Sequence, residues 1–276
     1  MLTLAELSDA LGDTFDVLRE IHQGGQRAVY EVAVSGDRRV LKLMPEAGRA
    51  RAEREVGIAR SFDHPNLPRV LDETVHELTI GGSDYVYFTE TLVEGETLAA
   101  RSEPMNPCEA LELGRQLASA VKYLWERHHV VHRDIKPLNI MVTPEGKYIL
   151  LDLGVARHQD RSTLTVVAGE HQPGTIGYLA PEQLAPLKGR EIDYRADFFC
   201  IGIVVFEQLT GHLPFDPAAP SYRTLLMTGN LSGLDEYPPP VAGLLGRLLA
   251  PRAHARFRLD RIDDAIRTAM GELECF

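Results

Sequence analysis

The chain is poor in cysteine and in basic residues, and both shortages exclude classes of function. Its 276 residues contain only Cys108, Cys200 and Cys275, and none of them forms a Cys-x-x-Cys pair. The sequence therefore predicts neither a disulfide framework nor a zinc site, and it favours a reducing cytoplasm. Lys and Arg number 29 against 40 Asp and Glu, which gives a net charge of -11. This acidity argues against nucleic acid or an anionic membrane as a main partner.

Long apolar runs are also missing. The longest, residues 198–206, is too short to cross a bilayer and predicts a buried helix. Residues 1–12 lack the basic start and apolar stretch of a signal peptide, and the chain has no repeat or low-complexity tail. Hydrophobic residues nevertheless make up 44% of the chain and charged residues 25%. This composition is typical of a globular protein with one large domain or two lobes.

The most informative stretch runs from His132 to Asn139. It places a carboxylate, a cation and an amide within six residues, at Asp134, Lys136 and Asn139. Phosphoryl transfer needs a carboxylate for the hydroxyl proton, a cation for the phosphate and an oxygen ligand for Mg²⁺. A second carboxylate, Asp152, follows thirteen residues after Asn139 in an Asp-Leu-Gly motif. The two segments resemble the catalytic loop and the metal-binding motif of the eukaryotic-type protein kinases.

That resemblance implies a role for each side chain. Asp134 would accept or orient the proton of the substrate hydroxyl, Lys136 would steady the γ-phosphate, and Asn139 and Asp152 would bind the metal. A lysine two residues after the aspartate is similar to the Ser/Thr-specific kinases rather than to the tyrosine kinases.

A segment ending at Val29 resembles the glycine-rich phosphate loop of the family only in part. The pattern G-x-G-x-x-G-x-V puts His22, Gly24 and Arg27 at the three glycine places, with Gly25 beside the middle one. Gly24 and Gly25 are the candidates for close backbone contact with phosphates. A plain hairpin turn explains the segment equally well, and Arg27 either prevents tight closure or holds a phosphate by its charge.

Lys42 ends the strand after this loop, at the place of the family's lysine that contacts the α- and β-phosphates and pairs with a glutamate. The following helix offers Glu53 and Glu55, and the distance to a His-Pro-Asn landmark at residues 64–66 selects Glu55. A solvated helix face with an Arg51–Glu55 pair is the simpler alternative. We favour pairing because Lys42 needs an acidic partner and Glu53 points elsewhere around the helix.

Residues 91–95 resemble the hinge whose backbone binds adenine, with Thr91 and Val93 as candidates. The gatekeeper position of the family, at the edge of the adenine pocket, falls on Glu90, or on Thr89 if the chain has a one-residue insertion here. The resemblance also implies that three apolar side chains enclose the purine ring, although simple core packing accounts for them too. These are Val29, Val40 and Met141.

Residues 154–182 have the length of an activation segment and end in the G-T-x-x-Y-x-A-P-E pattern of Ser/Thr kinases. By resemblance, Thr175 would hydrogen-bond near Asp134 and Lys136. A phosphate on this segment would pair with arginines and order it, and a solvated loop is an equally good interpretation. The candidate acceptors are Ser162, Thr163 and Thr165, and the candidate arginines are Arg51, Arg133 and Arg157.

Two later residues match structural positions of the family. Asp197 matches the aspartate that holds the catalytic-loop backbone near His132 and Arg133, because a buried carboxylate needs hydrogen-bond donors. Arg256 matches the arginine that pairs with Glu182 of the A-P-E pattern, as a structural clamp.

Periodicity and turn signals place the elements. Strands are expected at residues 15–21, 29–34, 38–44, 70–77 and 85–89, with a small hairpin at 140–142 and 148–151. Helices are expected at residues 4–11, 47–61, 107–127, 193–210, 244–249 and 261–270, with the three prolines at 238–240 as a connector.

We therefore predict an α+β chain with the bilobal protein kinase fold. An N-terminal lobe at residues 1–90 has a five-stranded antiparallel sheet and one main helix, residues 91–95 form the hinge, and residues 96–276 form a mainly helical C-terminal lobe. The predicted activity is γ-phosphoryl transfer from ATP, with Mg²⁺ or Mn²⁺, to Ser or Thr of cytoplasmic proteins and, through self-association, of the chain itself. A pseudokinase scaffold, favoured by the eroded glycine loop, and a small-molecule kinase, opposed by the activation segment, are the alternatives.

Overall fold

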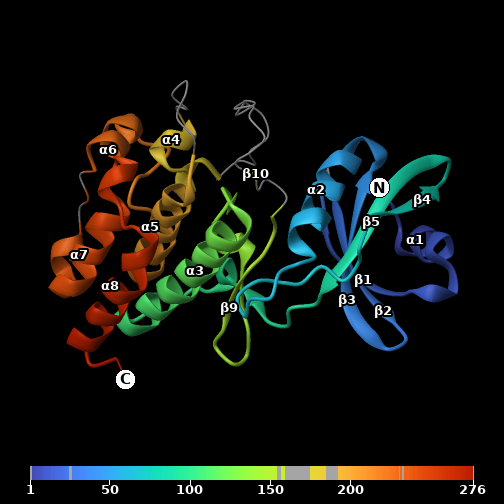
Figure 1. Ribbon diagram of the computed structural model, residues 1–276, viewed down its shortest axis with the longest axis horizontal. Helices are drawn as coiled ribbons and strands as arrows, with labels where there is room; N and C mark the ends of the chain where they lie inside the picture. The colour runs from blue at the N-terminus through green and yellow to red at the C-terminus, as the bar shows by residue number, and fades with distance from the viewer. Residues whose placement is uncertain are drawn as a thin grey trace. The chain divides into compact units, whose positions relative to one another are not determined.

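The computed structural model describes residues 2–24, 27–153, 157–158, 175–184, 192–229, 231 and 233–275. The chain divides into two compact units, Met1–Glu94 and Gly95–Phe276. Figure 1 shows a twisted sheet with helices in the first unit and a bundle of helices in the second.

The N-terminal unit is built on one antiparallel sheet of five strands in the order β1-β2-β3-β5-β4. The predicted sheet is thus confirmed, but its fourth strand lies later than expected. Val70 makes only an isolated bridge to Glu90, and the strand itself begins at His76. The elements are α1 (Leu4–Leu11), η1 (Gly12–Thr14), β1 (Asp16–Gln23), β2 (Ala28–Val34), β3 (Asp37–Pro45), η2 (Glu46–Gly48), α2 (Arg49–Ala59), β4 (His76–Ile80) and β5 (Ser83–Thr91).

The two faces of this sheet pack against different helices. Leu7 and Leu11 of α1 join Tyr30, Leu41 and Leu43 in a buried cluster. Side chains alternate along a strand, so Lys42, between Leu41 and Leu43, faces the other way, toward Glu55 of α2. The helix expected at residues 4–11 is confirmed as α1, and a capping box starts it. Its apolar face then explains why this short helix stays on the sheet.

The C-terminal unit is mainly helical. Helix α5 is buried along nearly its whole length and packs against α3 and α7. The prolines at 238–240 cap and begin α7 instead of forming a connector, because proline suits the first turn of a helix. The elements are β6 (Glu96–Thr97), η3 (Leu98–Ala100), α3 (Pro107–His128), β7 (Val130–Val131), η4 (Pro137–Asn139), β8 (Ile140–Val142), β9 (Tyr148–Leu150), β10 (Arg157–His158), η5 (Thr175–Tyr178), α4 (Pro181–Leu184), α5 (Tyr194–Thr210), α6 (Tyr222–Thr228), η6 (Leu234–Glu236), α7 (Pro239–Leu248), η7 (Ala253–Ala255) and α8 (Leu259–Glu272).

Among the helices of the described residues, none combines the length and the apolar character that a bilayer crossing requires.

The prediction that the cysteines stay unpaired is wrong for two of them. Cys108 and Cys275 form a disulfide across 167 residues of sequence, while Cys200 is buried as a thiol. The reason is tertiary: α8 packs along α3, so the start of one helix meets the end of the other (Figure 1). A pocket of about 410 Å³ lies beside the bond and is also lined by Glu112, Arg115, Arg267 and Met270.

This disulfide gives a testable prediction. Closing so long a loop removes unfolded-state entropy, so reduction should lower the free energy of unfolding by up to about 5 kcal/mol. Urea unfolding of the wild-type chain with and without dithiothreitol measures the difference. In the Cys108→Ser variant, dithiothreitol should have no effect. Equal urea midpoints for oxidised and reduced wild type would show that α8 is held by packing alone.

Candidate active site

The segment between β7 and β8 brings two predicted catalytic side chains together with a predicted metal ligand. The Lys136 ammonium lies 3.0 Å from Oδ2 of Asp134. The side-chain amide of Asn139 donates to the Asp134 carbonyl oxygen at 2.8 Å and to Oδ2 at 2.9 Å. The turn η4 reverses the chain between them, with Asn139 N donating to the Lys136 carbonyl. Both side-chain contacts reach the same oxygen, so they hold the Asp134 carboxylate in one orientation.

Asp197 fixes the backbone that leads into this segment, as predicted. Its two carboxylate oxygens accept the backbone N–H groups of His132 and Arg133, each at 2.8 Å. Complete burial raises the pKa of Asp197, and the two N–H donors oppose that rise. Arg133 has a φ of 71°, a strained conformation for a residue with a side chain. Gln183 holds it as well, by donating to the Arg133 carbonyl at 3.0 Å.

Asp152 follows the β8–β9 hairpin, directly after a residue whose backbone bonds to Asn139. Leu151 N donates to the Asn139 carbonyl at 2.8 Å, and His132 Nε2 lies 3.0 Å from the Leu151 carbonyl. Asp152 itself has a φ of 66°, a second strained residue at this site. A carboxylate and an amide oxygen suit Mg²⁺, which takes few protein ligands and completes its shell with phosphates and water. In the described residues, no cluster of three or more His, Cys, Asp or Glu could hold a metal unaided.

The N-terminal unit contains the predicted phosphate-binding lysine, Lys42, and its acidic partners. Lys42 Nζ lies 2.8 Å from Oε1 of Glu55 and 2.8 Å from Oε2 of Glu90. All three side chains are buried, and the ammonium also lies 5.6 Å from the centre of the Phe88 ring. By contrast, Glu53 is 54% exposed and pairs with Arg49. The structure thus joins Lys42 to the acid that the sequence selected, and it adds a second one.

Comparison with known families matches residues 15–262 to the protein kinase domain. The chain belongs to this family. Its five-stranded sheet and its helical second unit are those of the bilobal protein kinase fold.

Relatives with similar sequences include bacterial serine/threonine-protein kinases. PrkC of Bacillus subtilis is 35% identical over 170 residues, covering 60% of this chain and 24% of PrkC. PknB of Mycobacterium leprae is 32% identical over 226 residues, covering 79% of this chain and 35% of PknB. A probable PknB of Lactococcus lactis is 29% identical over 225 residues, covering 77% of this chain and 34% of its own length. The chain thus spans about a quarter to a third of these relatives.

The register between β3 and β5 shows which of the two candidates, Thr89 or Glu90, lies beside Lys42. In the β3–β5 pairing, Thr89 stands opposite Leu41 and Glu90 opposite Val40. Val40 and Lys42 share one face of β3 because side chains alternate, so Glu90 lies on the Lys42 face. Thr89 points the other way and donates its hydroxyl to Asp72 at 2.8 Å. Glu90, not Thr89, is therefore the neighbour of the kinase lysine.

The predicted nucleotide-binding residues have the following places. Gly24 closes the β1–β2 hairpin by donating to the Arg27 carbonyl, Val29 lies in β2, and Val40 is buried in β3. Thr91 ends β5 and donates its N–H to the Arg69 carbonyl, Val93 follows the strand, and Met141 lies in β8. Gly25, Ser162, Thr163, Thr165 and the side chains of Thr175 and Arg157 lie outside the described residues.

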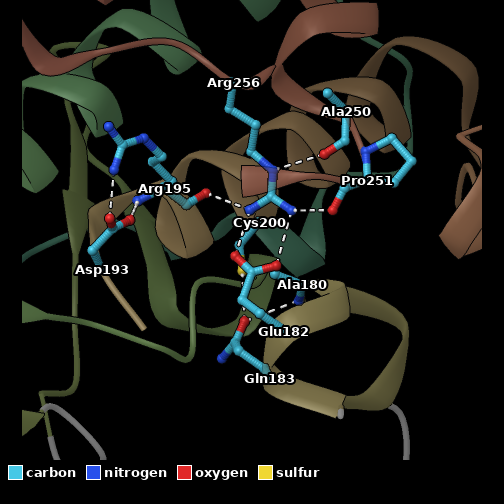
Figure 2. A network of polar contacts seen from close by, with 9 residues as sticks. All are labelled: Ala180, Glu182, Gln183, Asp193, Arg195, Cys200, Ala250, Pro251 and Arg256. Carbon is cyan, nitrogen blue, oxygen red and sulfur yellow. Dashed lines mark hydrogen bonds and ion pairs between the residues drawn. The ribbon is translucent and has the colours of Figure 1, made fainter. Parts of the chain in front are cut away.

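The kinase A-P-E glutamate forms the predicted clamp with Arg256 (Figure 2). Arg256 is fully buried, and its two terminal nitrogens donate to the two oxygens of Glu182 at 2.6 and 2.9 Å. The same guanidinium donates to three carbonyl oxygens and stacks 4.6 Å from the Phe199 ring centre. Those carbonyls belong to Ala250, Pro251 and Arg195.

Sequence reasoning missed two polar residues of this site. Gln183 follows the A-P-E glutamate, yet nothing in its spacing indicated the bond to Arg133. The sequence indicates Glu90 only as a candidate for the gatekeeper position and not as a partner of Lys42. The alternation of β5, once its register with β3 was known, would have placed it beside Lys42.

Proposed function

We propose that this chain is a Ser/Thr protein kinase domain that transfers the γ-phosphoryl group of Mg-ATP to protein hydroxyls. The observation that carries the proposal is the Asp134 carboxylate, held by Lys136 at 3.0 Å and Asn139 at 2.9 Å. A fixed base next to a cation suits a reaction that depends on positioning and charge rather than on covalent chemistry. The lysine two residues after Asp134, and the names of the bacterial relatives, support Ser and Thr as acceptors.

Each side chain then has one task. Asp134 orients the acceptor hydroxyl and receives its proton, while Lys136 stabilises charge on the γ-phosphate. Lys42, held by Glu55, contacts the α- and β-phosphates. Bound Mg²⁺ would neutralise phosphate charge, with Asn139 and Asp152 as its protein ligands. The remaining proposed contacts are Gly24, Gly25, Val29, Val40, Thr91, Val93 and Met141 for the nucleotide and Thr175 for the catalytic loop.

Incubation with γ-labelled ATP tests the proposal. We expect label on Ser or Thr of a generic basic protein or of the chain itself, and none after EDTA removes divalent ions. Returning Mg²⁺ or Mn²⁺ separately shows which metal serves. The Lys42→Met variant should lose transfer, because the phosphates lose their buried cation.

Other labelling patterns would support the alternatives. Nucleotide binding without transfer would point to a pseudokinase scaffold, for which His22 and Arg27 in place of loop glycines are the argument. Label confined to a small metabolite would point to a small-molecule kinase.

We place the reaction in the cytoplasm, where ATP is available, with protein substrates as partners and a second copy of the chain as the partner for autophosphorylation. Disulfides are rare and usually transient in that compartment, so the Cys108–Cys275 bond should be reduced there for part of the time.

A further inference from the structure

The N-terminal unit buries an acid to which the roles above give no task. Glu90 is only 6% exposed, near the end of β5. Its Oε2 lies as close to Lys42 Nζ, at 2.8 Å, as does Oε1 of Glu55. One ammonium group therefore serves two buried carboxylates.

The charged groups that act on Glu90 come from three parts of the N-terminal unit. Lys42 reaches it from β3, Glu55 from α2, and Arg27 from the residue before β2. Arg27 Nη1 also lies 4.0 Å from Oε2 of Glu55. Lys42 and Arg27 thus share this site with two acids, Glu55 and Glu90.

Burial keeps the pKa of Glu90 above its usual value. Lys42 and Arg27 oppose the rise, while the negative charge of Glu55 adds to it. An additional negative charge nearby would raise this pKa further.

A nucleotide brings such a charge. Lys42 Nζ contacts both Glu55 and Glu90, so a phosphate that reaches this ammonium also comes close to the Glu90 carboxylate. A phosphate charge close to an ionised Glu90 would weaken nucleotide binding, because two negative charges repel each other strongly where water is largely excluded. If Glu90 is protonated instead, the nucleotide affinity falls by about tenfold for each unit by which the pH exceeds the pKa of Glu90. Burial, which already raises the pKa of Glu90, lowers the cost of this protonation.

We propose that Glu90 takes up one proton from solvent when the phosphates of a nucleotide reach Lys42, so that nucleotide binding is coupled to proton uptake. The carboxylate becomes a neutral carboxyl group, and the ammonium then has one charged partner fewer to share with phosphate. Glu90 is thus a positioning residue that acts through Lys42. The inference rests on the proposed nucleotide site. By linkage, nucleotide affinity must rise as the pH falls.

Calorimetric titration of Mg-ADP measures this coupling directly. Titrations in two buffers of unequal ionisation enthalpy give the number of protons taken up per nucleotide. The phosphate of ADP also titrates, so the informative quantity is the difference between the wild-type chain and Glu90→Gln. We expect the wild type to take up as much as about one proton more than the variant near pH 7.

The affinities should change in the same sense. From about pH 8 to about pH 6, wild-type affinity should rise about tenfold more than that of Glu90→Gln. Near the alkaline end the variant should bind more tightly than the wild type, although it has lost a charged contact. A purely structural role for Glu90 would weaken binding at every pH.

Matched variants separate the outcomes. Glu53→Gln removes an exposed acid from α2 and should behave as the wild type does. Glu90→Met also removes the carboxyl group and should reproduce Glu90→Gln if its circular dichroism is native. Equal proton counts in the wild type and both Glu90 variants would overturn this inference alone. Failure of the folded wild type to bind Mg-ADP would overturn the proposed function and the inference with it.

Discussion

Asp134→Asn should slow phosphoryl transfer by about three orders of magnitude or more while leaving nucleotide affinity nearly unchanged. The amide keeps the size of the carboxylate but can neither receive the hydroxyl proton nor pair with the Lys136 ammonium, which lies 3.0 Å from Oδ2. The loss therefore concerns the transition state and not the bound nucleotide. Initial rates with labelled ATP, together with the dissociation constant of Mg-ADP, measure both quantities.

The control for this substitution is Asp260→Asn, which makes the same chemical change at a half-exposed side chain on α8. It should keep wild-type activity. A rate within about tenfold of wild type for Asp134→Asn would mean that Asp134 is not the base, because a positioned base contributes at least about a hundredfold.

Arg256→Ala should lower the free energy of unfolding by about 3–5 kcal/mol, the usual cost of breaking a buried ion pair. The arginine is fully buried, and its removal leaves the Glu182 carboxylate and three backbone carbonyls without their donor. Glu182 keeps 26% of its side chain exposed, so water recovers part of the loss. Urea unfolding followed by circular dichroism measures the change.

Two further variants sharpen the Arg256 experiment. Arg256→Lys keeps the charge but cannot match five donors in a planar fork, so it should recover only part of the stability. Arg258→Ala removes a nearby arginine that is 73% exposed and should change the unfolding free energy by less than about 1 kcal/mol. An Arg256→Ala chain as stable as Arg258→Ala would show that the clamp contributes little.

Much of the fold followed from local pattern. The helices expected at residues 4–11 and 107–127 are confirmed as α1 and α3. Each begins with a capping box, in which the N-cap side chain bonds to backbone only three residues away. The fourth strand was misplaced since 70–77 has strand-like composition, yet Val70 makes only one bridge. Strand pairing is decided by a partner elsewhere in the chain, which composition does not reveal.

The cluster of Asp134, Lys136 and Asn139 could be predicted because the three residues are close in sequence and one short turn, η4, brings them together. The Lys42–Glu55 pair could be predicted only through a family landmark. The Lys42–Glu90 pair and the Cys108–Cys275 disulfide could not, because they connect residues 48 and 167 positions apart through strand register and helix packing.

The sequence by itself determined the class of chemistry: the types and order of the charged side chains are those of a phosphoryl-transfer enzyme. Only the tertiary structure decided which acids share Lys42 and which cysteines meet. The physical reason is that residue types are a property of the chain, whereas burial and distance depend on how its segments pack. Burial and distance determine how strongly these charges act on each other.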